Sequence, residues 1–345
     1  MESLRGDDKI REQFNLLVNA PALFNAITTA AEFRIFHFLA ERPDSGFEEI
    51  RAFTGVPAHQ LRVLLQAVCA TGLLQRSAGA YRNSSVAAEL LATDADDSWS
   101  HILIGWKEVY YPAFAQMTTA LRAGRNTALD MYPGDEPTLY QRLARDPDLE
   151  RVFHKAMSAF TLRSVDALVE RPEFENVRHL LDIGGGDGTT SVRLASRHPE
   201  LQCTVVDMPS VARLGDETTV ALPDRVRLHP ADIFADDFPT GSDAVLFSHV
   251  LEIFDEDRIV GQLKKAYDVL PDGGTVFVYG YNVSDDETEG LFGARLGLYF
   301  NVLASGQGMA YPARDYENWL RSVGFRDVRT VAGMPYEHGL TVGIK

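Results

Sequence analysis

The chain has 345 residues, of which 45% are hydrophobic and 24% charged, a composition that excludes a disordered or fibrous protein. This length predicts two domains, or one domain with a large accessory segment. The formal charge of −16 disfavours nucleic acid and anionic lipid as partners, because a strongly acidic surface repels both.

The sequence carries no signal for export or membrane insertion. Residues 1–13 mix charges of both signs without an apolar core, and no apolar run reaches the roughly 18 residues that span a bilayer. Cys69 and Cys203 each lie in an apolar segment, which favours buried, reduced thiols over a disulfide or a metal pair. We therefore expect a cytoplasmic protein that does not enter a membrane.

Residues 11–91 place apolar side chains at helical spacing. The pattern predicts a short helix over 47–55, a longer helix over 57–72 and a hairpin over 73–81, which is the element order of a winged helix. The helix over 57–72 carries Arg62 as its only Lys or Arg, and this argues against DNA binding. Its apolar face instead predicts packing within the domain or against a second subunit.

Residues 98–175 are predicted to form a mostly helical connector rich in aromatic residues. At helical spacing, aromatic side chains are usually part of a core. Phe153, Met157 and Phe160 share one helical face, however, and they fit the lining of an aromatic or apolar ligand pocket.

From His179 onward, short β-rich runs alternate with helical patterns, and this alternation predicts an α/β fold with a parallel sheet covered on both faces. The last two runs are separated by a turn-like segment at 334–337 and predict an antiparallel pair at one edge of the sheet. The predicted strands lie within residues 179–184, 203–208, 226–232, 243–251, 274–283, 327–333 and 338–345.

A glycine-rich loop follows the first of these strands, where Asp182-Ile183-Gly184-Gly185-Gly186-Asp187-Gly188 opens directly into a helix. A strand, a glycine loop and a helix N-terminus form a site for a nucleotide. The dinucleotide fingerprint needs Gly or Ala at Thr189, so NAD and FAD are disfavoured. Asp207 lies about 20 residues after the loop, the spacing of an acceptor for ribose hydroxyls. Asp232 and Ile233 suit an adenine edge, and together these features predict an adenosine ligand without a pyrophosphate.

Five segments resemble the class I S-adenosylmethionine-dependent methyltransferases of the small-molecule O-methyltransferase type, which include caffeate and hydroxyindole enzymes and bacterial tailoring enzymes. The segments are LLDIGGGDGTTSVRLASRHP, VVDMPSVA, PADIFADDFP, DAVLFSHVL and LPDGGTVFVY. The resemblance covers nearly the whole chain. It implies a Rossmann-like, seven-stranded S-adenosylmethionine-binding domain over 176–345, a connector over 98–175 that contributes to the substrate pocket, and a winged-helix domain over 1–97 that forms a homodimer.

The resemblance also implies roles for individual residues. The residues that it assigns to the cofactor are Gly184 and Gly186 at the methionine part, Asp207 at the ribose, Met208, Asp232 and Ile233 at the adenine, and Ser248 at the sulfonium side. Asp182 is also predicted to bind the cofactor. Arg295 and Tyr299, in the predicted helix that begins near residue 291, would face the substrate together with the aromatic residues of the connector.

The chain departs from the family after the fourth strand. The family usually reads V-L-H-D-W, with the histidine as general base, whereas Glu252 occupies that position here. A carboxylate is a weak base for a phenol unless burial raises the pKa of the carboxylate. His249 precedes Glu252 by three residues, so the two side chains are candidates for a His–Glu dyad or for two ligands of a metal completed by the substrate. We assign them as the catalytic residues and assign no metal.

The leading hypothesis is therefore an S-adenosylmethionine-dependent methyltransferase of secondary metabolism that acts on an aromatic, polyketide-like or keto-acid metabolite. Glu252 leaves two alternatives open. One is a family member that binds the cofactor without methylating, such as a decarboxylase, hydroxylase or pericyclase. The other is a metal-assisted C-methyltransferase of a keto acid. A DNA-binding regulator is disfavoured by the acidic charge.

Overall fold

The computed structural model describes the backbone of residues 2–345 and the side chains of residues 8–216 and 218–345. The chain divides into two compact units, Met1–Lys107 and Glu108–Lys345. The boundary falls inside a π-helical turn at Trp106–Tyr110.

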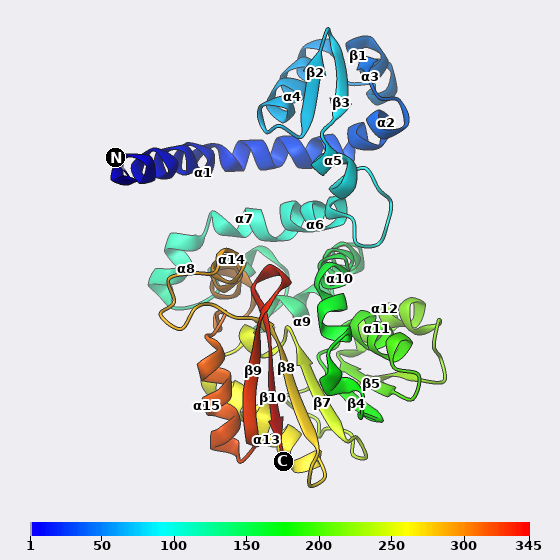
Figure 1. Cartoon of the computed structure of the whole chain (residues 1–345), viewed down its shortest axis with the longest axis vertical. Coiled ribbons are helices and arrows are strands. Elements are labelled where there is room, and N and C mark those ends of the chain that lie inside the picture. The colour runs from blue at the N-terminus through cyan, green and yellow to red at the C-terminus, as the bar shows by residue number, and fades with distance from the viewer. Residues whose placement is uncertain (1) are drawn as a thin grey trace. The chain divides into compact units, whose positions relative to one another are not determined.

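The first unit is mostly helical and contains one small antiparallel sheet of order β1-β3-β2 (Figure 1). The short helix, the longer helix and the hairpin follow one another as expected. In α4, Leu61, Leu65 and Val68 are buried in the core of this unit, so the apolar face of this helix packs within the unit. The elements are α1 (Glu2–Glu32), α2 (Ile35–Glu41), β1 (Ser45–Gly46), α3 (Phe47–Thr54), α4 (Ala58–Ala70), β2 (Leu74–Ser77), β3 (Ala80–Asn83), α5 (Ser85–Leu90) and α6 (Trp99–Gly105).

The second unit opens with helices, as the aromatic connector predicts. The longest of them, α10, begins where the Asp146 side chain accepts a hydrogen bond from the Leu149 amide at 3.1 Å and Pro147 takes the first helical position. The helices before the large sheet are α7 (Tyr111–Phe114), α8 (Met117–Ala123), α9 (Leu139–Leu143) and α10 (Pro147–Val169).

A seven-stranded sheet forms the centre of the second unit, with the order β6-β5-β4-β7-β8-β10-β9. The five strands from β4 to β8 pair in parallel, and β10 is antiparallel to both of its neighbours. The predicted α/β class and the antiparallel edge pair are confirmed. The strands are β4 (His179–Ile183), β5 (Gln202–Asp207), β6 (Val226–Pro230), β7 (Ala244–Ser248), β8 (Thr275–Tyr281), β9 (Arg326–Met334) and β10 (His338–Ile344).

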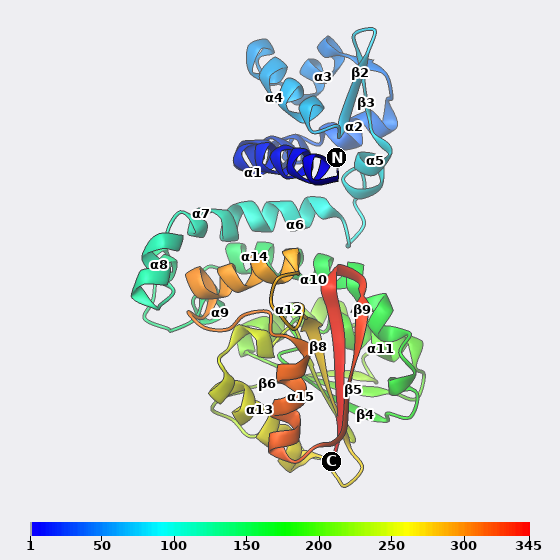
Figure 2. The ribbon, with the colours of Figure 1, turned by 60° about the vertical axis from the view of Figure 1, so that its left-hand side comes forward.

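Helices cover both faces of this sheet, because right-handed crossovers that run in opposite directions from β4 and from β7 place their helices on opposite faces. Helix α10 packs with α11, and α13 packs with α15 (Figure 2). Each face buries a row of Leu, Val, Ile and Phe side chains in alternation along the strands. The helices are α11 (Thr189–Arg197), α12 (Pro209–Thr219), α13 (Glu256–Val269), α14 (Leu291–Tyr299) and α15 (Ala313–Val323).

The strand order brings the candidate site residues to one edge. The parallel strands β4, β5, β6 and β7 end near the glycine loop, Asp207, Asp232 and Ser248 respectively. Because β10 is antiparallel to β8, its first residue, His338, lies opposite Tyr281, the last residue of β8. His338, at the amino end of β10, therefore lies at the same edge of the sheet as the carboxyl ends of the parallel strands.

Both cysteines are free; Cys203 is buried and Cys69 is half-buried. Burial raises the pKa of the Cys203 thiol to about 12. Among residues 2–345, no helix combines the length and the hydropathy that crossing a membrane requires.

The core of the second unit depends on contacts between the sheet and the segment that precedes it. Phe277 of β8 is fully buried, and its ring stacks on Phe174 at 4.4 Å between centroids. We expect Phe277→Ala to lower the free energy of unfolding by about 3–5 kcal/mol through the lost burial and the cavity left behind. Val220→Ala, at an exposed position, should change it by less than about 0.5 kcal/mol. Urea denaturation followed by circular dichroism measures both, and equal effects of the two variants would contradict this packing.

Candidate active site

The loop between β4 and α11 is shaped by three glycines with left-handed backbone angles. Gly184, Gly186 and Gly188 have φ of +67°, +63° and +84°. A Cβ atom at Gly184 would lie 2.5 Å from a methyl group of Val250, whereas one at Gly186 would meet nothing within 4 Å. The loop therefore packs closely on its β7 side and is open at Gly186, where a ligand can approach the backbone.

Asp182 lies beneath this loop and is fully buried. The Ser191 hydroxyl donates a hydrogen bond to its carboxyl group at 2.7 Å, and a Cβ atom at Gly185 would lie 2.7 Å from the same group. Burial raises the pKa of Asp182 to about 7, against the opposing effect of the Ser191 hydrogen bond. The structure thus places Asp182 as a support of the loop from below.

Asp207, at the end of β5, joins the loop to the next strand. Its Oδ2 accepts a hydrogen bond from the Gly186 amide at 2.8 Å, and its Oδ1 accepts one from the Met208 amide at 2.7 Å. Each oxygen retains a further lone pair, so the group can still accept hydrogen bonds from a diol. Burial raises the pKa of Asp207 to about 6, although these two amide hydrogen bonds act in the opposite direction.

Two further carboxyl groups that the sequence did not single out lie near Asp207. Asp187 accepts hydrogen bonds from the hydroxyls of Ser158 at 2.6 Å and Thr189 at 2.7 Å. Glu150 of α10 is buried, and its charge, like that of Asp187, contributes to the raised pKa of Asp207. Within the described part of the chain, Glu150 Oε1 has no hydrogen-bond partner. This half of the site is therefore acidic and suits a ligand that carries positive charge or hydroxyl donors.

Asp232 and Ile233 follow β6 and are held beside Asp207. The Ala231 amide donates a hydrogen bond to the Asp207 carbonyl at 2.9 Å. The Asp232 carboxylate accepts a hydrogen bond from the Phe234 amide at 2.9 Å, and the Ile233 carbonyl accepts one from Lys265 at 2.7 Å. The predicted ribose and adenine residues thus lie on neighbouring strand ends.

Ser248 ends β7, and the chain turns sharply at His249, which has φ of +59°. The His249 amide donates to the Tyr279 carbonyl at 2.9 Å, and this bond fixes the turn on β8. A 3-10 turn at Leu251–Ile253 then directs Glu252 inward, where only 1% of the residue is exposed. His249 Nδ1 lies 3.2 Å from Glu252 Oε1, so the two predicted catalytic side chains are hydrogen bonded.

Two glycines make room for Glu252. A Cβ atom at Gly280 would lie 2.5 Å from Glu252 Oε2, and one at Gly308, where φ is +76°, would lie 2.2 Å from the Glu252 carbonyl oxygen. Any larger residue at either position would displace Glu252. The carboxyl group is therefore packed against the backbone of β8, with Oε2 unpartnered within the described residues.

His338 is the second partner of His249, and the sequence did not single it out. The Nε2 atoms of the two rings are 3.2 Å apart, and His338 Nδ1 lies 2.6 Å from the Pro335 carbonyl oxygen. The His338 ring lies against the rings of Tyr279 and Tyr281, at 4.9 and 4.4 Å between centroids. Burial, reinforced by the neighbouring His249, lowers the pKa of His338 to about 3.

His249 and Glu252 were also candidates for two ligands of a metal ion. Among the side chains that the structure describes, no group of three or more His, Cys, Asp or Glu residues is arranged to hold a metal ion. The ligand atoms of His249 and Glu252 also point toward each other. Their arrangement fits a hydrogen-bonded pair.

The substrate residues expected from the sequence gather around Tyr110. The Tyr110 ring stacks on Tyr299 at 4.0 Å between centroids and lies 6.5 Å from Phe153. Its hydroxyl is 3.5 Å from the Met157 sulfur, and the Arg295 guanidinium lies over the ring at 5.5 Å. Burial raises the pKa of Tyr110 to about 12, and the charge of Arg295 opposes this shift.

Phe160 contacts Tyr281, and Tyr281 lies beside His249. The Phe160 ring lies 6.2 Å from Tyr281, and Tyr281 lies 5.3 Å from His249. Burial raises the pKa of the Tyr281 hydroxyl, and the charge of Arg295 opposes this shift. Aromatic rings thus extend from α10 to His249, and we call this group of packed rings the aromatic chamber; its members are Tyr110, Phe153, Phe160, Tyr281 and Tyr299.

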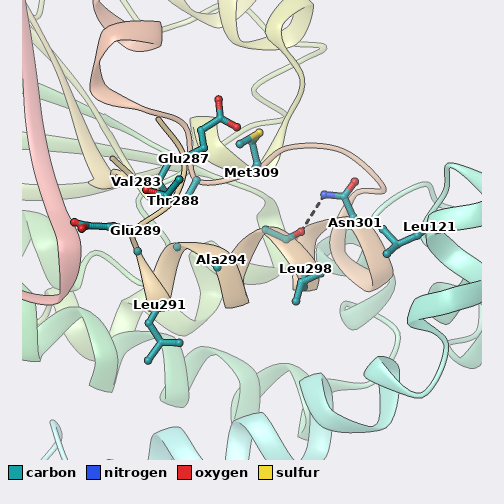
Figure 3. Close-up of a pocket in the computed structure, with 14 residues that line it drawn as sticks. Leu121, Val283, Glu287, Thr288, Glu289, Leu291, Ala294, Leu298, Asn301 and Met309 are labelled. Atoms are coloured by element: carbon teal, nitrogen blue, oxygen red, sulfur yellow. Dashed lines mark hydrogen bonds between the residues drawn. The ribbon is translucent and has the colours of Figure 1, made fainter. Parts of the chain in front are cut away.

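A cavity of about 580 Å³ lies along α14 (Figure 3). Leu291, Ala294 and Leu298 line it from this helix, whereas Arg295 and Tyr299 of the same helix contact Tyr110. Because successive helical residues are about 100° apart, these two sets occupy neighbouring faces of α14, with Leu291 beside Arg295.

Comparison with known proteins identifies the family. The model of the O-methyltransferase domain matches residues 114–326. The chain is 33% identical to the L-tyrosine C(3)-methyltransferase of Streptomyces lavendulae over 308 residues, which cover 88% of this chain and 83% of that enzyme. The chain belongs to the O-methyltransferase family.

Two further comparisons agree with this assignment. The 3-hydroxy-5-methyl-1-naphthoate 3-O-methyltransferase of Streptomyces sahachiroi is 31% identical over 92% of this chain and 91% of its own length. The crystal structure of the S-adenosylmethionine-dependent methyltransferase SibL is 33% identical, with a TM-score of 0.80 over 96% of this chain and 98% of that one. The protein is a small-molecule methyltransferase, and its cofactor is S-adenosylmethionine, as predicted.

The geometry at Asp207 generates a prediction for cofactor binding. Asp207→Ala removes a charged acceptor and should weaken binding of S-adenosylmethionine by about 10- to 100-fold in calorimetry. Because the pKa of Asp207 is raised to about 6, the group takes up a proton as the pH falls through that value, and affinity for hydroxyl donors should fall with it. Asp207→Asn should remove this dependence on pH. Asp272→Ala, at an exposed position before β8, serves as the control, and equal affinities of the Asp207→Ala and control variants would contradict the assignment.

Proposed function

We propose that this methyltransferase acts on a phenolic aromatic acid and that the His249–Glu252 pair receives the proton of the phenol. The observation that carries the proposal is the buried contact of 3.2 Å between His249 Nδ1 and Glu252 Oε1, at the position where the family usually has its histidine base. The pair adjoins the aromatic chamber, whose rings suit a planar substrate.

The substrate class rests on the charge in the chamber and on the relatives. Arg295 supplies a positive charge among the tyrosines that line the chamber, and a guanidinium is a good partner for a carboxylate. The names of the two most informative relatives specify L-tyrosine and a hydroxynaphthoate, each of which carries a ring hydroxyl and a carboxylate. A phenolic acid with Arg295 at its carboxylate satisfies both features.

We propose that the loop at Gly184 and Gly186 holds the methionine part of the cofactor and that Asp207 accepts the ribose hydroxyls. Met208, Asp232 and Ile233 would lie at the adenine, and Ser248 at the sulfur side. The open backbone at Gly186 and the remaining lone pairs of Asp207 fit these roles. When bound, S-adenosylmethionine supplies a methyl group on a positively charged sulfur.

The chain's own residues then orient the ring, exclude water and hold the proton. Phe153, Met157 and Phe160 fix the ring in place, and such positioning accounts for a large part of the rate in a displacement reaction. The proton of the ring hydroxyl passes to the His249–Glu252 pair, which gains one positive charge beside the phenolate. The phenolate shares its charge between the oxygen and the adjacent ring carbons, so the same pair serves methylation at either atom.

Replacing Glu252 tests this function. Glu252→Gln keeps the shape but loses the proton acceptor, so we expect kcat to fall by about 10²- to 10⁴-fold with cofactor binding unchanged. Glu256→Gln, at an exposed position in the first turn of α13, is the control and should keep the native rate. Mass spectrometry with methyl-labelled cofactor should find the label on the ring oxygen or on the carbon beside it. An unlabelled product, or native turnover by Glu252→Gln, would reject the proposal.

We also propose that the protein forms a homodimer through α1. Ile10, Phe14, Leu17 and Val18 are each more than half exposed, and they follow one another at intervals that place them on one helical face. An apolar stripe of this kind on a surface helix is typical of a contact with another chain. A second copy of the same helix offers a complementary stripe.

Light scattering of the full chain measures this directly. The native protein should have about twice the chain mass of 38.2 kDa at micromolar concentration. The double variant Phe14→Glu and Leu17→Glu should be a monomer, because a charge in an apolar contact is costly. Asn19→Glu adds a charge on the opposite face of α1 and should stay dimeric. A native protein that scatters as a monomer would exclude the dimer.

A further inference from the structure

We infer that His338 is a positioning residue that fixes the tautomer of His249, through a buried chain of hydrogen bonds from Glu252 to the Pro335 carbonyl. The inference rests on the proposed function, because it concerns the pair that receives the substrate proton. It adds a residue from the last strand of the sheet to the site, with a role that can be measured without substrate.

The contact between His338 and the Pro335 carbonyl determines which atoms donate along this series of hydrogen bonds. The Pro335 carbonyl can only accept a hydrogen bond, so His338 Nδ1, at 2.6 Å, must be the donor. This contact identifies the Nδ1-protonated form of His338. The turn at Pro335–Glu337 presents the carbonyl inward because Tyr336 and Glu337 both have left-handed backbone angles, with φ of 59° and 66°.

The second nitrogen of His338 is an acceptor. The ring is 1% exposed and packs against two tyrosine rings, so a second proton would create a buried charge with no anion in contact. The low pKa of His338, caused mainly by burial, agrees with this. Nε2 of His338 therefore carries a lone pair, and His249 Nε2, at 3.2 Å, must donate to it.

These two steps determine what His249 offers to Glu252. With a proton fixed on Nε2, only Nδ1 of His249 can change its protonation, and Nδ1 faces Glu252 Oε1. One proton is shared in that contact, either as imidazolium and carboxylate or as neutral imidazole and carboxylic acid. Glu252 Oε2, which has no partner among the described residues, is left as the acceptor for the ring hydroxyl of the substrate.

The same turn also holds the helix that contributes to the aromatic chamber. The Glu337 carboxylate accepts hydrogen bonds from the first amides of α14, those of Leu291, Phe292 and Gly293, at 2.7, 3.0 and 3.1 Å. A carboxylate at a helix N-terminus stabilises the helix through its unpaired amides. Residues 337 and 338 thus fix the substrate helix and the proton of His249 from one turn.

The test compares two substitutions of His338. Gln places an amide donor and a carbonyl acceptor near the two ring nitrogens, whereas Leu removes both groups and keeps the volume. We expect His338→Gln to retain most of kcat and His338→Leu to lose about 10- to 100-fold in kcat, with little change in the KM of the phenolic acid. The pH profile of kcat should shift in the Leu variant and stay in place in the Gln variant. Around this network, the charge of Glu252 acts on Tyr140, Tyr279, Tyr281 and Tyr316, the charge of Arg295 acts on Tyr281, and the charge of His249 acts on His338.

A readout independent of turnover is nitrogen-15 NMR of the histidine rings in the full chain without cofactor. The native protein should show His338 protonated at Nδ1 only and His249 protonated at Nε2. His338→Leu should release the Nε2 proton of His249 to exchange with water. Circular dichroism and thermal melting establish whether each variant is folded, and the native NMR spectrum decides the tautomers if a variant is not.

The outcomes separate this inference from the proposed function. A native spectrum with His338 protonated at Nε2, or a folded His338→Leu variant with native kcat and pH profile, overturns the inference. Native turnover by Glu252→Gln would overturn the proposed function instead, and the tautomers measured by NMR would still stand. Loss of kcat in His338→Leu together with the expected tautomers supports both.

Discussion

The burial of the Glu252 carboxyl group is the constraint on which the rest of this site depends. A carboxyl group that is 1% exposed has lost its water, and the loss must be compensated by hydrogen bonds and by a shared proton. His249 provides the hydrogen bond, and the glycines at 280 and 308 provide the space. A side chain at Gly280 or a different turn at His249 would leave an unpaired charge inside the protein.

The antiparallel direction of β10 supplies the second partner of His249. A ring that donates to Glu252 needs its second nitrogen fixed, and His338 is in reach because β10 runs against β8 and begins at the carboxyl edge of the sheet. The nucleotide half of the site obeys a simpler rule, since Asp207 and the glycine loop come from parallel strands that end together. One edge of the sheet therefore combines residues from the ends of parallel strands with one residue from the start of an antiparallel strand.

Much of this could be predicted from the sequence. The β-rich runs, the glycine loop and Asp207 follow local patterns of spacing, and the structure has the strands where they were expected. The position of Glu252 could be assigned because a residue just beyond a parallel strand faces the ligand crevice. His338 could not be identified in this way, because the rule applies to the ends of parallel strands and His338 begins an antiparallel one. Glu150 could not be identified for another reason. In the sequence, a charged residue in the first turn of a helix is expected to face solvent, and only the packing of α10 in the folded chain shows that Glu150 is buried.

The most direct test of the account is a crystal structure of the enzyme with S-adenosylhomocysteine and a phenolic aromatic acid. The account predicts that the ring hydroxyl lies at hydrogen-bond distance, about 2.6–3.2 Å, from Glu252 Oε2, with the carboxylate of the ligand at Arg295. A ligand whose hydroxyl is bound elsewhere, with Glu252 Oε2 still buried and unpartnered, would contradict it.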